Sequence, residues 1–441
     1  MTAPPPRGWQ PSAFVDHVRE VLSELIRRQD RRLSLRAFVD LPKGWTSADS
    51  DVRPRAAWRP PQGLRAEALG VAATCPLQEV RWQDDAPHPD DLTTLRGWLA
   101  QFPLLADAVL ACAFPENRPD GVVVPLHLWL PRLWLAEQSD GRTEATLLLL
   151  GEDAADTLLT ELDRLFASVM PRAVDAVEFV AVDPPHDQHA KRIGQLVDAM
   201  RSGAAHKVVW SRVLALETSG ARAAVARQMA QNRPEAWLVD VELPTGANIL
   251  CATPELLVRC TGGTVTTMAL AGTGSVAQLS AEDPRLGDEH GRVRDFVQAR
   301  LTALGVQELT LQADLTQAGP LTHRRTHITG QRTQDVDALT AALTLHPTPA
   351  LLGLPRANAL ALVETVEPPR GLYAGCLGRL ACDGSGDGEV VALLRGVAQE
   401  HGGWHARAGA GLVPDSIPKD ESAEIAQKLA AIVQSVNGGA A

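Results

Sequence analysis

The chain has 441 residues, of which 45% are hydrophobic and 22% are charged, and its formal net charge is −11. This composition indicates a globular protein, and the length allows two or three domains or one large intertwined core. The negative charge argues against a nucleic-acid partner or an anionic membrane surface, so an anionic ligand would need locally placed cations or a metal.

The N-terminus and the cysteines bear on the cellular compartment. Met1–Pro6 lacks the apolar core of a signal peptide, and no run in the sequence approaches the length of a membrane span. The six cysteines are scattered without a Cys-x-x-Cys pair, which in a chain of this length favours reduced, structural thiols. We therefore expect a cytoplasmic protein.

The first part of the chain predicts a loose tail followed by many short elements. Residues 1–12 are expected to be the tail, and Ala13–Arg28 has apolar residues at helical spacing. Residues 33–150 alternate short apolar runs with Pro and Gly turns, which predicts short, partly antiparallel strands. Further helices are predicted over Asp153–Met170 and His189–Met200. No repeat or linker is visible, and the softest break lies near residues 180–190.

The second part predicts alternating strands and longer helices. The predicted strands are Lys207–Leu216, Ala236–Leu243, Ile249–Ala252, Glu255–Arg259 and a hairpin of Leu372–Ala381 with Val390–Val397 around a Gly/Asp-rich tip. The predicted helices are Ala223–Gln231, Asp283–Leu304, Ala338–Thr344, Arg356–Val366 and Pro418–Val436. In the last of these helices, Ile425, Leu429, Ile432 and Val436 are expected to face the core.

Lys207 opens an apolar, β-branched stretch that predicts a strand buried on at least one face. It follows the turn-like residues Ser202–Ala205. An ammonium beside a buried strand loses hydration, which favours the neutral base. The alternative is a surface lysine at the end of the strand, and from this stretch alone that alternative is the more common one.

The last predicted helix places Glu421, Glu424 and Lys428 on one face, because they are three and four residues apart. An isolated helix with this pattern is usually a solvated face with one weak ion pair. Here, however, it follows Ala408–Gly411, whose small residues allow backbone amides to approach a ligand. Glu289–His290 adds a carboxylate near the start of another helix. Carboxylates that converge from two helices suit Mg2+.

Ten short pieces of the sequence occur in the order found in one enzyme family. They are Lys207–Arg212, Ala252–Leu257, Ala269–Thr273, Glu289–His290, Thr322–Thr326, Leu345–Ala350, Arg370–Gly375, Leu394–Arg395, Ala408–Gly411 and Ser416–Lys428. The chain thereby resembles the chorismate-utilising enzymes, the family of isochorismate synthase, salicylate synthase, anthranilate synthase component I and aminodeoxychorismate synthase. The resemblance covers residues 200–436 continuously, with a fainter echo at Leu130–Arg132.

The resemblance implies an α+β fold. We expect one catalytic domain over residues 13–441, with a less recognisable half (13–185) and a motif-bearing half (186–436). Each half would contribute an antiparallel sheet, with helices outside and the site between the sheets. From the sequence pattern alone, only a mixed α/β protein with many short strands follows.

The resemblance also implies residue roles. Mg2+ held by Glu289, Glu424 and Glu421 would bind the ring carboxylate of chorismate. Lys207 would be the general base that deprotonates water for attack at C2, and Glu255 the general acid that protonates the departing 4-hydroxyl. The residues expected to line the pocket are Thr273, His323, Thr348, Tyr373, Arg395, Gly409, Gly411 and Lys428.

Some of these roles have alternatives. Arg395 is the natural fork for the enolpyruvyl carboxylate. Thr348 and His346 are equally well explained as parts of a Pro-rich turn. Tyr373, the only tyrosine in the chain, also suits a packed strand aromatic. Glu255 is less well explained as a mere strand-end carboxylate.

The residue type at the position of Lys207 differs between members of the family. The ammonia-using synthases typically carry glutamine at this position, so lysine indicates that water is the nucleophile. Isochorismate synthase is then favoured over salicylate synthase by Leu345–Ala350, and the product would feed menaquinone or siderophore biosynthesis. We expect no amidotransferase partner and a monomer or weak homodimer. The alternatives are an ammonia-using subunit and a non-catalytic homologue, which the retained Lys207, Glu255 and carboxylates argue against.

The sequence departs from the family pattern in several places. Gly274–Val276 stands where an arginine usually follows Ala-Gly-Thr, and Arg285 replaces the usual lysine before His290. Arg407 replaces the usual aromatic or aliphatic residue before Ala-Gly-Ala-Gly, and Leu393–Arg395 replaces a more usual Ala-Ile-Arg. None of these changes removes a proposed catalytic group, but they bear on product specificity.

Overall fold

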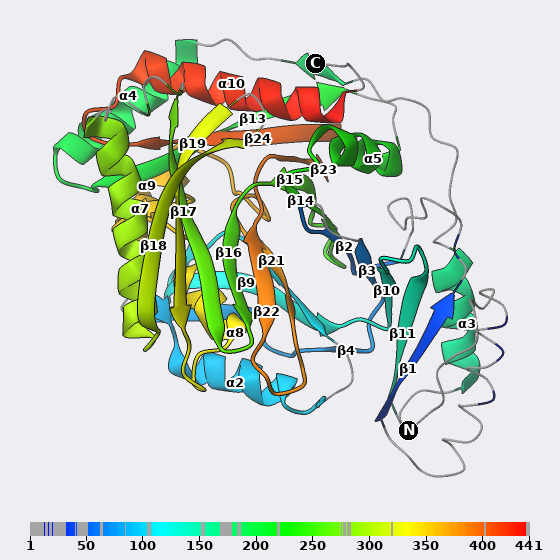
Figure 1. The fold of residues 1–441 in the computed structure, drawn as a ribbon. Coiled ribbons are helices and arrows are strands. Elements are labelled where there is room, and N and C mark those ends of the chain that lie inside the picture. The colour runs from blue at the N-terminus through cyan, green and yellow to red at the C-terminus, as the bar shows by residue number, and fades with distance from the viewer. Residues whose placement is uncertain are drawn as a thin grey trace.

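The computed structural model describes residues 13, 16 and 20 and residues 32–437, except 40, 42–51, 62–64, 84, 104–106, 151–154, 168–178, 183–186, 218–220, 275, 277–278, 280–283, 319–320 and 401–402. The predicted tail over residues 1–12 and almost all of the predicted helix Ala13–Arg28 lie outside the described residues. Figure 1 shows the described strands as two large sheets, with the helices on their outer faces.

The first sheet is antiparallel throughout and has twelve described strands. In spatial order they are β1 (Arg32–Val39), β11 (Thr143–Leu150), β10 (Leu133–Glu137), β3 (Ala66–Leu69), β2 (Arg55–Arg59), β14 (Trp237–Glu242), β15 (Asn248–Thr253), β23 (Gly396–Glu400), β24 (Gly403–Leu412), β13 (Lys207–Glu217) and β12 (Val180–Val182), with β20 (Gly353–Leu354) paired to β13. We call it sheet A.

The second sheet, sheet B, is also antiparallel and has twelve described strands. Their order is β18 (Gln307–Ala318), β19 (Leu321–Gln331), β17 (Thr264–Gly274), β16 (Leu256–Thr261), β22 (Gly388–Ala392), β21 (Cys376–Leu380), β7 (Ala108–Cys112), β9 (Gly121–Leu130), β5 (Glu79–Gln83) and β6 (Ala86–Pro87), with β4 (Ala73–Thr74) and β8 (Glu116–Arg118) paired to β9.

Both sheets draw strands from both halves of the chain. Sheet A combines β1–β3 and β10–β12 with β13–β15, and sheet B combines β4–β9 with β16–β19. The expected α+β fold with two antiparallel sheets is therefore confirmed, but the expectation that each half builds one sheet is wrong. Each sheet contains strands from both halves of the chain, so the break predicted near residues 180–190 does not separate one sheet from the other.

The helices cover the outer faces of the sheets. They are α2 (Pro89–Leu99), α3 (Ala155–Ala167), α4 (Asp187–Arg201), α5 (Arg222–Asn232), α7 (Pro284–Ala303), α8 (Ala338–Leu345), α9 (Arg356–Glu364) and α10 (Pro418–Val436). In Figure 1, α10 (red) runs across β24 and β13, and α7 stands beside β17–β19. No helix in the described part of the chain is long and apolar enough to cross a membrane.

Helix α10 forms where its sequence pattern predicts it. Pro418 suits the first helical turn, where no intrahelical N–H bond is lost, and Asp420 and Glu421 complement the positive end of the helix dipole. All four residues predicted to face the core are buried: Ile425, Leu429, Ile432 and Val436. They belong to a core cluster that also includes residues of α4 and of sheet A. The six cysteines are likewise buried and unpaired, as predicted.

The predicted hairpin of Leu372–Ala381 with Val390–Val397 is partly wrong. Only Cys376–Leu380 and Gly388–Ala392 pair, in sheet B, while Leu372–Gly375 forms a turn. The chain then leaves sheet B at Leu393–Arg395 and enters sheet A as β23. The apolar run looks continuous in the sequence because both of its strands are buried.

The chain passes between the two sheets several times, and two of these crossings lie next to each other beside the pocket. One crossing carries β15 of sheet A into β16 of sheet B through Pro254 and Glu255, and the other carries β22 into β23 through Leu393–Arg395. The Ala252 amide donates to the Arg395 carbonyl at 3.2 Å, and the Ala392 amide donates to the Glu255 carbonyl at 3.1 Å. The crossings therefore hold Glu255 and Arg395 next to each other.

Candidate functional site

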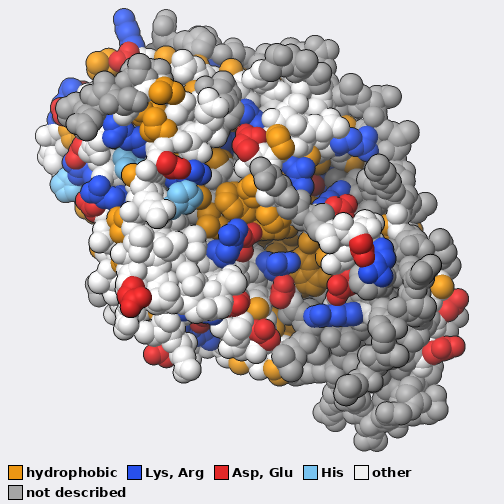
Figure 2. All heavy atoms as spheres, in the orientation of Figure 1, with side chains coloured by type: hydrophobic (Ala, Val, Ile, Leu, Met, Phe, Trp, Pro, Cys, Tyr) orange, Lys and Arg blue, Asp and Glu red, His pale blue; other side chains and the backbone are white. Residues whose placement is uncertain are grey.

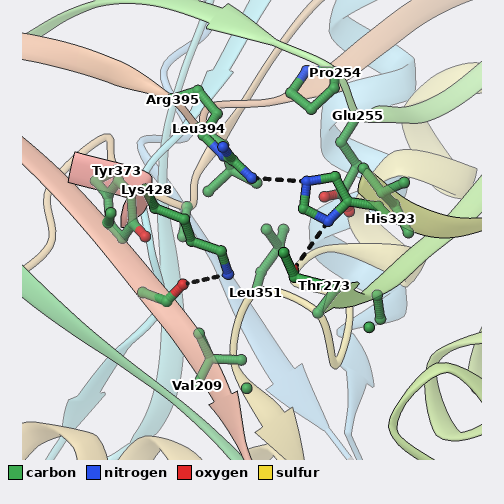
Figure 3. A pocket seen from close by; sticks show the side chains of 18 of the residues that line it. Val209, Pro254, Glu255, Thr273, His323, Leu351, Tyr373, Leu394, Arg395 and Lys428 are labelled. Carbon is green, nitrogen blue, oxygen red and sulfur yellow. Dashed lines mark hydrogen bonds between the residues drawn. The ribbon is translucent and has the colours of Figure 1, made fainter. Parts of the chain in front are cut away.

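A pocket lies where the sheets join, and Figure 3 shows it from close by. Its walls contain the predicted site residues Glu255, Thr273, Glu289, His323, Tyr373, Arg395, Gly409, Gly411 and Lys428, together with Val209, Pro254, Leu270–Gly272, Ala350, Leu351, Ala374, Leu394, Arg407 and Ala408. These residues come from β13, β17, β19, β24, α7, α10, the two crossings and the segments before β20 and β21. The fold thus gathers pieces that lie up to about two hundred residues apart in the sequence.

Lys207 is fully buried at the start of β13, so the interpretation as a surface lysine is wrong. Its Nζ lies 3.0 Å from Glu289 Oε1, which forms an ion pair beside the pocket. Both side chains occupy space that is free because residue 411 on β24 is glycine. A Cβ added at Gly411 would lie 2.3 Å from Glu289 Oε1 and 2.9 Å from Lys207 Cε. Gly411 is therefore required by the side chains packed over it.

Glu255 is buried at its crossing, with 3% of its surface exposed. It lies just before β16 and not within a strand as predicted. Burial raises its pKa to about 7, although the nearby charges of Lys207 and Arg395 act in the opposite direction. A large fraction of Glu255 is therefore protonated at neutral pH, as a general acid requires.

Arg395 stands at the second crossing in a left-handed conformation, with φ of 59°. One of its Nη2–H groups donates to His323 Nε2 at 3.0 Å, and His323 Nδ1 lies 3.0 Å from Thr273 Oγ1. Figure 3 shows these three side chains joined by the two contacts, with His323 between Arg395 and Thr273. Burial lowers the pKa of Arg395 to about 10, so its guanidinium remains charged at neutral pH.

The glycines of β24 expose backbone amides on the pocket side. Gly411 and Gly409 stand opposite Val209 and Ser211 in the register of β13 and β24. The Val209 and Ser211 amides donate to partners outside β24. Val209–Gly411 and Ser211–Gly409 are therefore non-hydrogen-bonded pairs, in which the backbone N–H and C=O groups of each strand point away from the other strand. Strand β23 pairs with β24 only as far as Ala406. The Gly409 and Gly411 amides therefore point to a side of β24 that no described strand covers.

Helix α10 brings its charged face to the same strand. Lys428 Nζ donates to the Gly409 carbonyl at 2.9 Å and lies 2.6 Å from Glu424 Oε1. Glu421 is buried one turn earlier, and its Oε1 accepts a hydrogen bond from Ser416 Oγ at 2.8 Å. The pattern predicted from the sequence is thus present, with Glu424 and Lys428 paired and Glu421 turned to Ser416.

The carboxylates near the pocket are candidate oxygen ligands for a divalent cation. Glu289 and Glu424 each have one lysine partner beside the pocket, so each carboxylate already balances a cation. Within the described ranges, no group of three or more acidic, His or Cys side chains is gathered at metal-binding distance. The oxygen donors have the chemistry that Mg2+ prefers. Glu289, Glu424 and Glu421 therefore fit a magnesium site by donor type, but only Glu289 of the three lines the pocket.

Thr348 does not reach the pocket wall. It is buried, and its carbonyl accepts the amides of Leu351 and Leu352 at 2.9 and 3.1 Å. Leu351 itself lines the pocket. His346 Nε2 contacts the Ala113 carbonyl at 3.1 Å. Both residues thus build the turn that supports the wall, in agreement with the alternative interpretation.

Arg407 is a pocket residue that was missed from the sequence, and Glu367 is an ion-pair partner behind it. Arg407 lines the pocket, and its Nε donates to Ser211 Oγ at 2.8 Å. Glu367 lies 3.6 Å from Arg407 and also pairs with Arg370. The Arg407 guanidinium lies 5.5 Å from the centre of the Tyr373 ring, so it packs on the tyrosine that lines the pocket. The departure of Arg407 from the family pattern was the only signal in the sequence.

Comparisons with known proteins place the chain in a family. The family description "Chorismate binding enzyme" matches residues 114–437. A relative from Mycobacterium tuberculosis, named "Putative isochorismate synthase MenF", is 34% identical over 286 residues, which cover 58% of this chain and 75% of the relative. Anthranilate synthase component 1 of Streptomyces coelicolor is 29% identical over 263 residues, covering 56% of this chain and 51% of that protein.

The fold is also found in solved structures. The structure of MenF, described as the menaquinone-specific isochorismate synthase from Escherichia coli, superposes with a TM-score of 0.74. The superposition covers 95% of this chain and all of the other, at 20% sequence identity. This similarity confirms the two-sheet fold, including the N-terminal strands that the family description does not match.

Proposed function

The chain belongs to the family of chorismate-binding enzymes, and we propose that it is an isochorismate synthase that adds water at C2 of chorismate with loss of the 4-hydroxyl. The observation that carries the proposal is one pocket with Lys207 beside it and Glu255 in its wall, where burial raises the pKa of Glu255 to about 7. The M. tuberculosis relative named as an isochorismate synthase supports the same activity.

The reaction needs one base and one acid. In its neutral form, Lys207 Nζ takes a proton from water as the water oxygen bonds to C2. The ring double bonds shift, the C4–O bond breaks, and Glu255 donates a proton to the departing hydroxyl, which leaves as water. Protonation is needed because hydroxide is a poor leaving group. In the reverse direction the two groups exchange roles.

Other residues bind and orient the substrate. Arg395 presents a charged, planar fork suited to the enolpyruvyl carboxylate, and Tyr373 adds a hydroxyl to the same region. The Gly409 and Gly411 amides and the Lys428 ammonium offer donors to the ring carboxylate. Both carboxylates of the substrate therefore find donors, on different walls of the pocket.

A divalent cation belongs to this proposal. Glu289, Glu424 and Glu421 are the residues that would hold Mg2+. When bound, the ion would neutralise the ring carboxylate of the substrate. The two lysine partners of Glu289 and Glu424 support the view that these carboxylates are placed to face positive charge. The product is proposed to feed menaquinone or siderophore biosynthesis in the cytoplasm, without an amidotransferase partner, from a monomer or weak homodimer.

The decisive experiment is product analysis with purified protein, chorismate and Mg2+. We expect isochorismate, little salicylate near neutral pH, and conversion of isochorismate back to chorismate. Stoichiometric pyruvate release, followed with a coupled dehydrogenase, would move the assignment to salicylate synthase. Formation of a fluorescent aromatic amine that depends on ammonia would contradict the role of Lys207. The Glu255→Ala variant is the matched control for uncatalysed breakdown of chorismate.

A further inference from the structure

Three residues from three different elements form a continuous hydrogen-bonded chain in the pocket wall. Thr273 on β17 and His323 on β19 are direct partners in the register of sheet B. Arg395 reaches His323 from the crossing between β22 and β23. Both contacts of the imidazole measure 3.0 Å, so each ring nitrogen has one defined partner.

The chemistry of arginine determines which nitrogen of His323 carries the proton. A guanidinium has N–H donors and no acceptor, so the atom facing Arg395 must accept. That atom is Nε2, and Nε2 can accept only when it carries no hydrogen. The proton of the neutral ring is therefore on Nδ1, which faces Thr273 Oγ1.

The surroundings of His323 favour the neutral ring. Only 4% of its surface is exposed. Burial holds its pKa well below the usual range, and the positive charges of Arg395 and Lys428 act in the same direction. A protonated ring would point a second N–H at the Arg395 guanidinium, with like charges in contact. Neutral His323 with its proton on Nδ1 satisfies both contacts at once.

The proton on His323 Nδ1 determines the hydrogen-bonding role of the Thr273 hydroxyl. Its Oγ1 accepts the Nδ1–H of His323, so its own hydroxyl hydrogen is directed elsewhere. Thr273 lines the pocket. We propose that His323 is a positioning residue that fixes the Thr273 hydroxyl as a hydrogen-bond donor into the pocket. This corner then favours a ligand group that accepts a hydrogen bond, such as a carboxylate or an enol-ether oxygen.

The proposal deepens the proposed function, on which it rests for the identity of the ligand. Chorismate has carboxylate and enol-ether oxygens of the required class. The protonation pattern of His323, however, follows from the protein contacts alone. It is therefore testable whether or not the protein makes isochorismate.

The first test is the 15N NMR spectrum of the histidine rings in the intact protein. Of the twelve histidines, the His323 signals are assigned by their absence in His323→Asn. We expect a protonated Nδ1 and an unprotonated Nε2 across the neutral pH range, in the absence of any ligand. A proton on Nε2, or on both nitrogens, would overturn the proposal regardless of the reaction catalysed.

The second test is the binding of chorismate, measured by calorimetry under conditions without turnover, in the Glu255→Ala background. Thr273→Ser keeps the hydroxyl and is expected to bind like its parent, whereas Thr273→Val should bind about ten- to a hundredfold more weakly. Equal affinity of the Ser and Val variants would contradict the donor role of Thr273.

Variants of His323 separate positioning from packing. Asparagine places an amide N–H about where Nδ1–H lies, while phenylalanine removes the donor and keeps a ring. We expect His323→Asn to retain part of the preference for Ser over Val at residue 273, and His323→Phe to abolish that preference. If salicylate is the product but these results hold, the proposed function fails and the positioning role stands.

Discussion

At the scale of single residues, Glu255 derives its chemistry from its position. A carboxyl at the end of a strand is ordinarily ionised at neutral pH, but this one is enclosed where the two sheets join. Burial disfavours the charged form more than the neighbouring cations Lys207 and Arg395 favour it, and the pKa rises from 4.5 to about 7. The same environment makes Glu255 sensitive to pH.

The first prediction concerns stability against pH. Below about 4.5, Glu255 is protonated in both states; between 4.5 and about 7 the unfolded chain releases the proton while the folded protein retains it. Wild type should therefore lose stability relative to Glu255→Gln as pH rises through this window, by on the order of 3 kcal/mol, and no more above it. Denaturant unfolding of both proteins from pH 4.5 to 8 measures the difference. Parallel curves would show that Glu255 is not protonated in the folded state.

The second prediction concerns the acid and the base together. Lys207→Ala and Glu255→Ala should each lower kcat about a hundredfold or more, because each removes one proton transfer. The two groups serve one substitution, so the double variant should be little slower than either single variant. Steady-state rates with chorismate give all four values. Losses that multiply would mean that the two residues act in separate steps.

At the scale of secondary-structure elements, β24 shows why a strand at the site carries glycine at alternate positions. The residues on its other face, Ala408 and Ala410, are buried in the core. On the pocket face, the position of Gly411 is overlaid by the ion pair of Lys207 and Glu289. A strand normally avoids glycine, and here the space that glycine leaves is occupied by charged side chains from two other elements.

The third prediction follows from that space. Gly411→Ala should displace the ion pair and reduce kcat at least a hundredfold while the protein remains folded, because the added methyl meets flexible side chains. The control is Gly287→Ala, on the same helix as Glu289, where a Cβ would meet nothing within 4 Å. That change should keep activity and raise stability by about 0.5–1 kcal/mol. Activity assays and thermal unfolding compare them. Equal activity of the two variants would refute the packing argument.

The fourth prediction concerns the proposed metal ligands on α7 and α10. A chelator should abolish activity, and added Mg2+ should restore it. Glu424→Gln should lose Mg2+ binding in calorimetry as well as activity, and should unfold within about 1 kcal/mol of wild type because its ion pair is partly exposed. Asp420→Asn, an exposed change on the same helix, should retain both. Full activity of Glu424→Gln in the presence of chelator would contradict the assignment.

At the scale of the whole molecule, the two sheets must keep a fixed relation for the pocket to exist. Crossings of the chain are one kind of connection between them, and Glu389 provides a second kind through its side chain. Glu389 on β22 of sheet B accepts the indole N–H groups of Trp58 and Trp237, on β2 and β14 of sheet A, at 3.2 Å each, and pairs with Arg259. Figure 2 shows the surface hollowed near the middle of one face, with hydrophobic side chains in the hollow and charged groups around it.

The fifth prediction concerns this second connection. Glu389→Ala leaves two indole N–H groups without their acceptor, so it should destabilise the protein by about 2–4 kcal/mol. Glu217→Ala, at an exposed strand end, should change stability by no more than about 0.5 kcal/mol. Denaturant unfolding followed by tryptophan fluorescence reports both. Similar stabilities would show that Glu389 does not hold the sheets together.

The sequence by itself determined the elements with strong local patterns and the residue types of the site. Helix α10 coincides with its predicted range because its apolar period, its N-terminal proline and its acidic first turn all act within the helix. Strand β13 and helix α7 were predicted within a few residues for the same reason. The ordered motifs indicated the family and named the groups that carry the chemistry.

Only the tertiary structure decided how these pieces are shared between the sheets. Val390–Val397 is one apolar run in the sequence, yet its two ends belong to different sheets. Because strands of both sheets are buried, the hydrophobic pattern does not show where the chain passes from one sheet to the other. The tertiary structure also decided that Lys207 is buried, that Thr348 lies in a turn and that Arg407 lines the pocket. Each depends on contacts between residues far apart in the chain, and a local pattern contains no information about which distant strand becomes the neighbour.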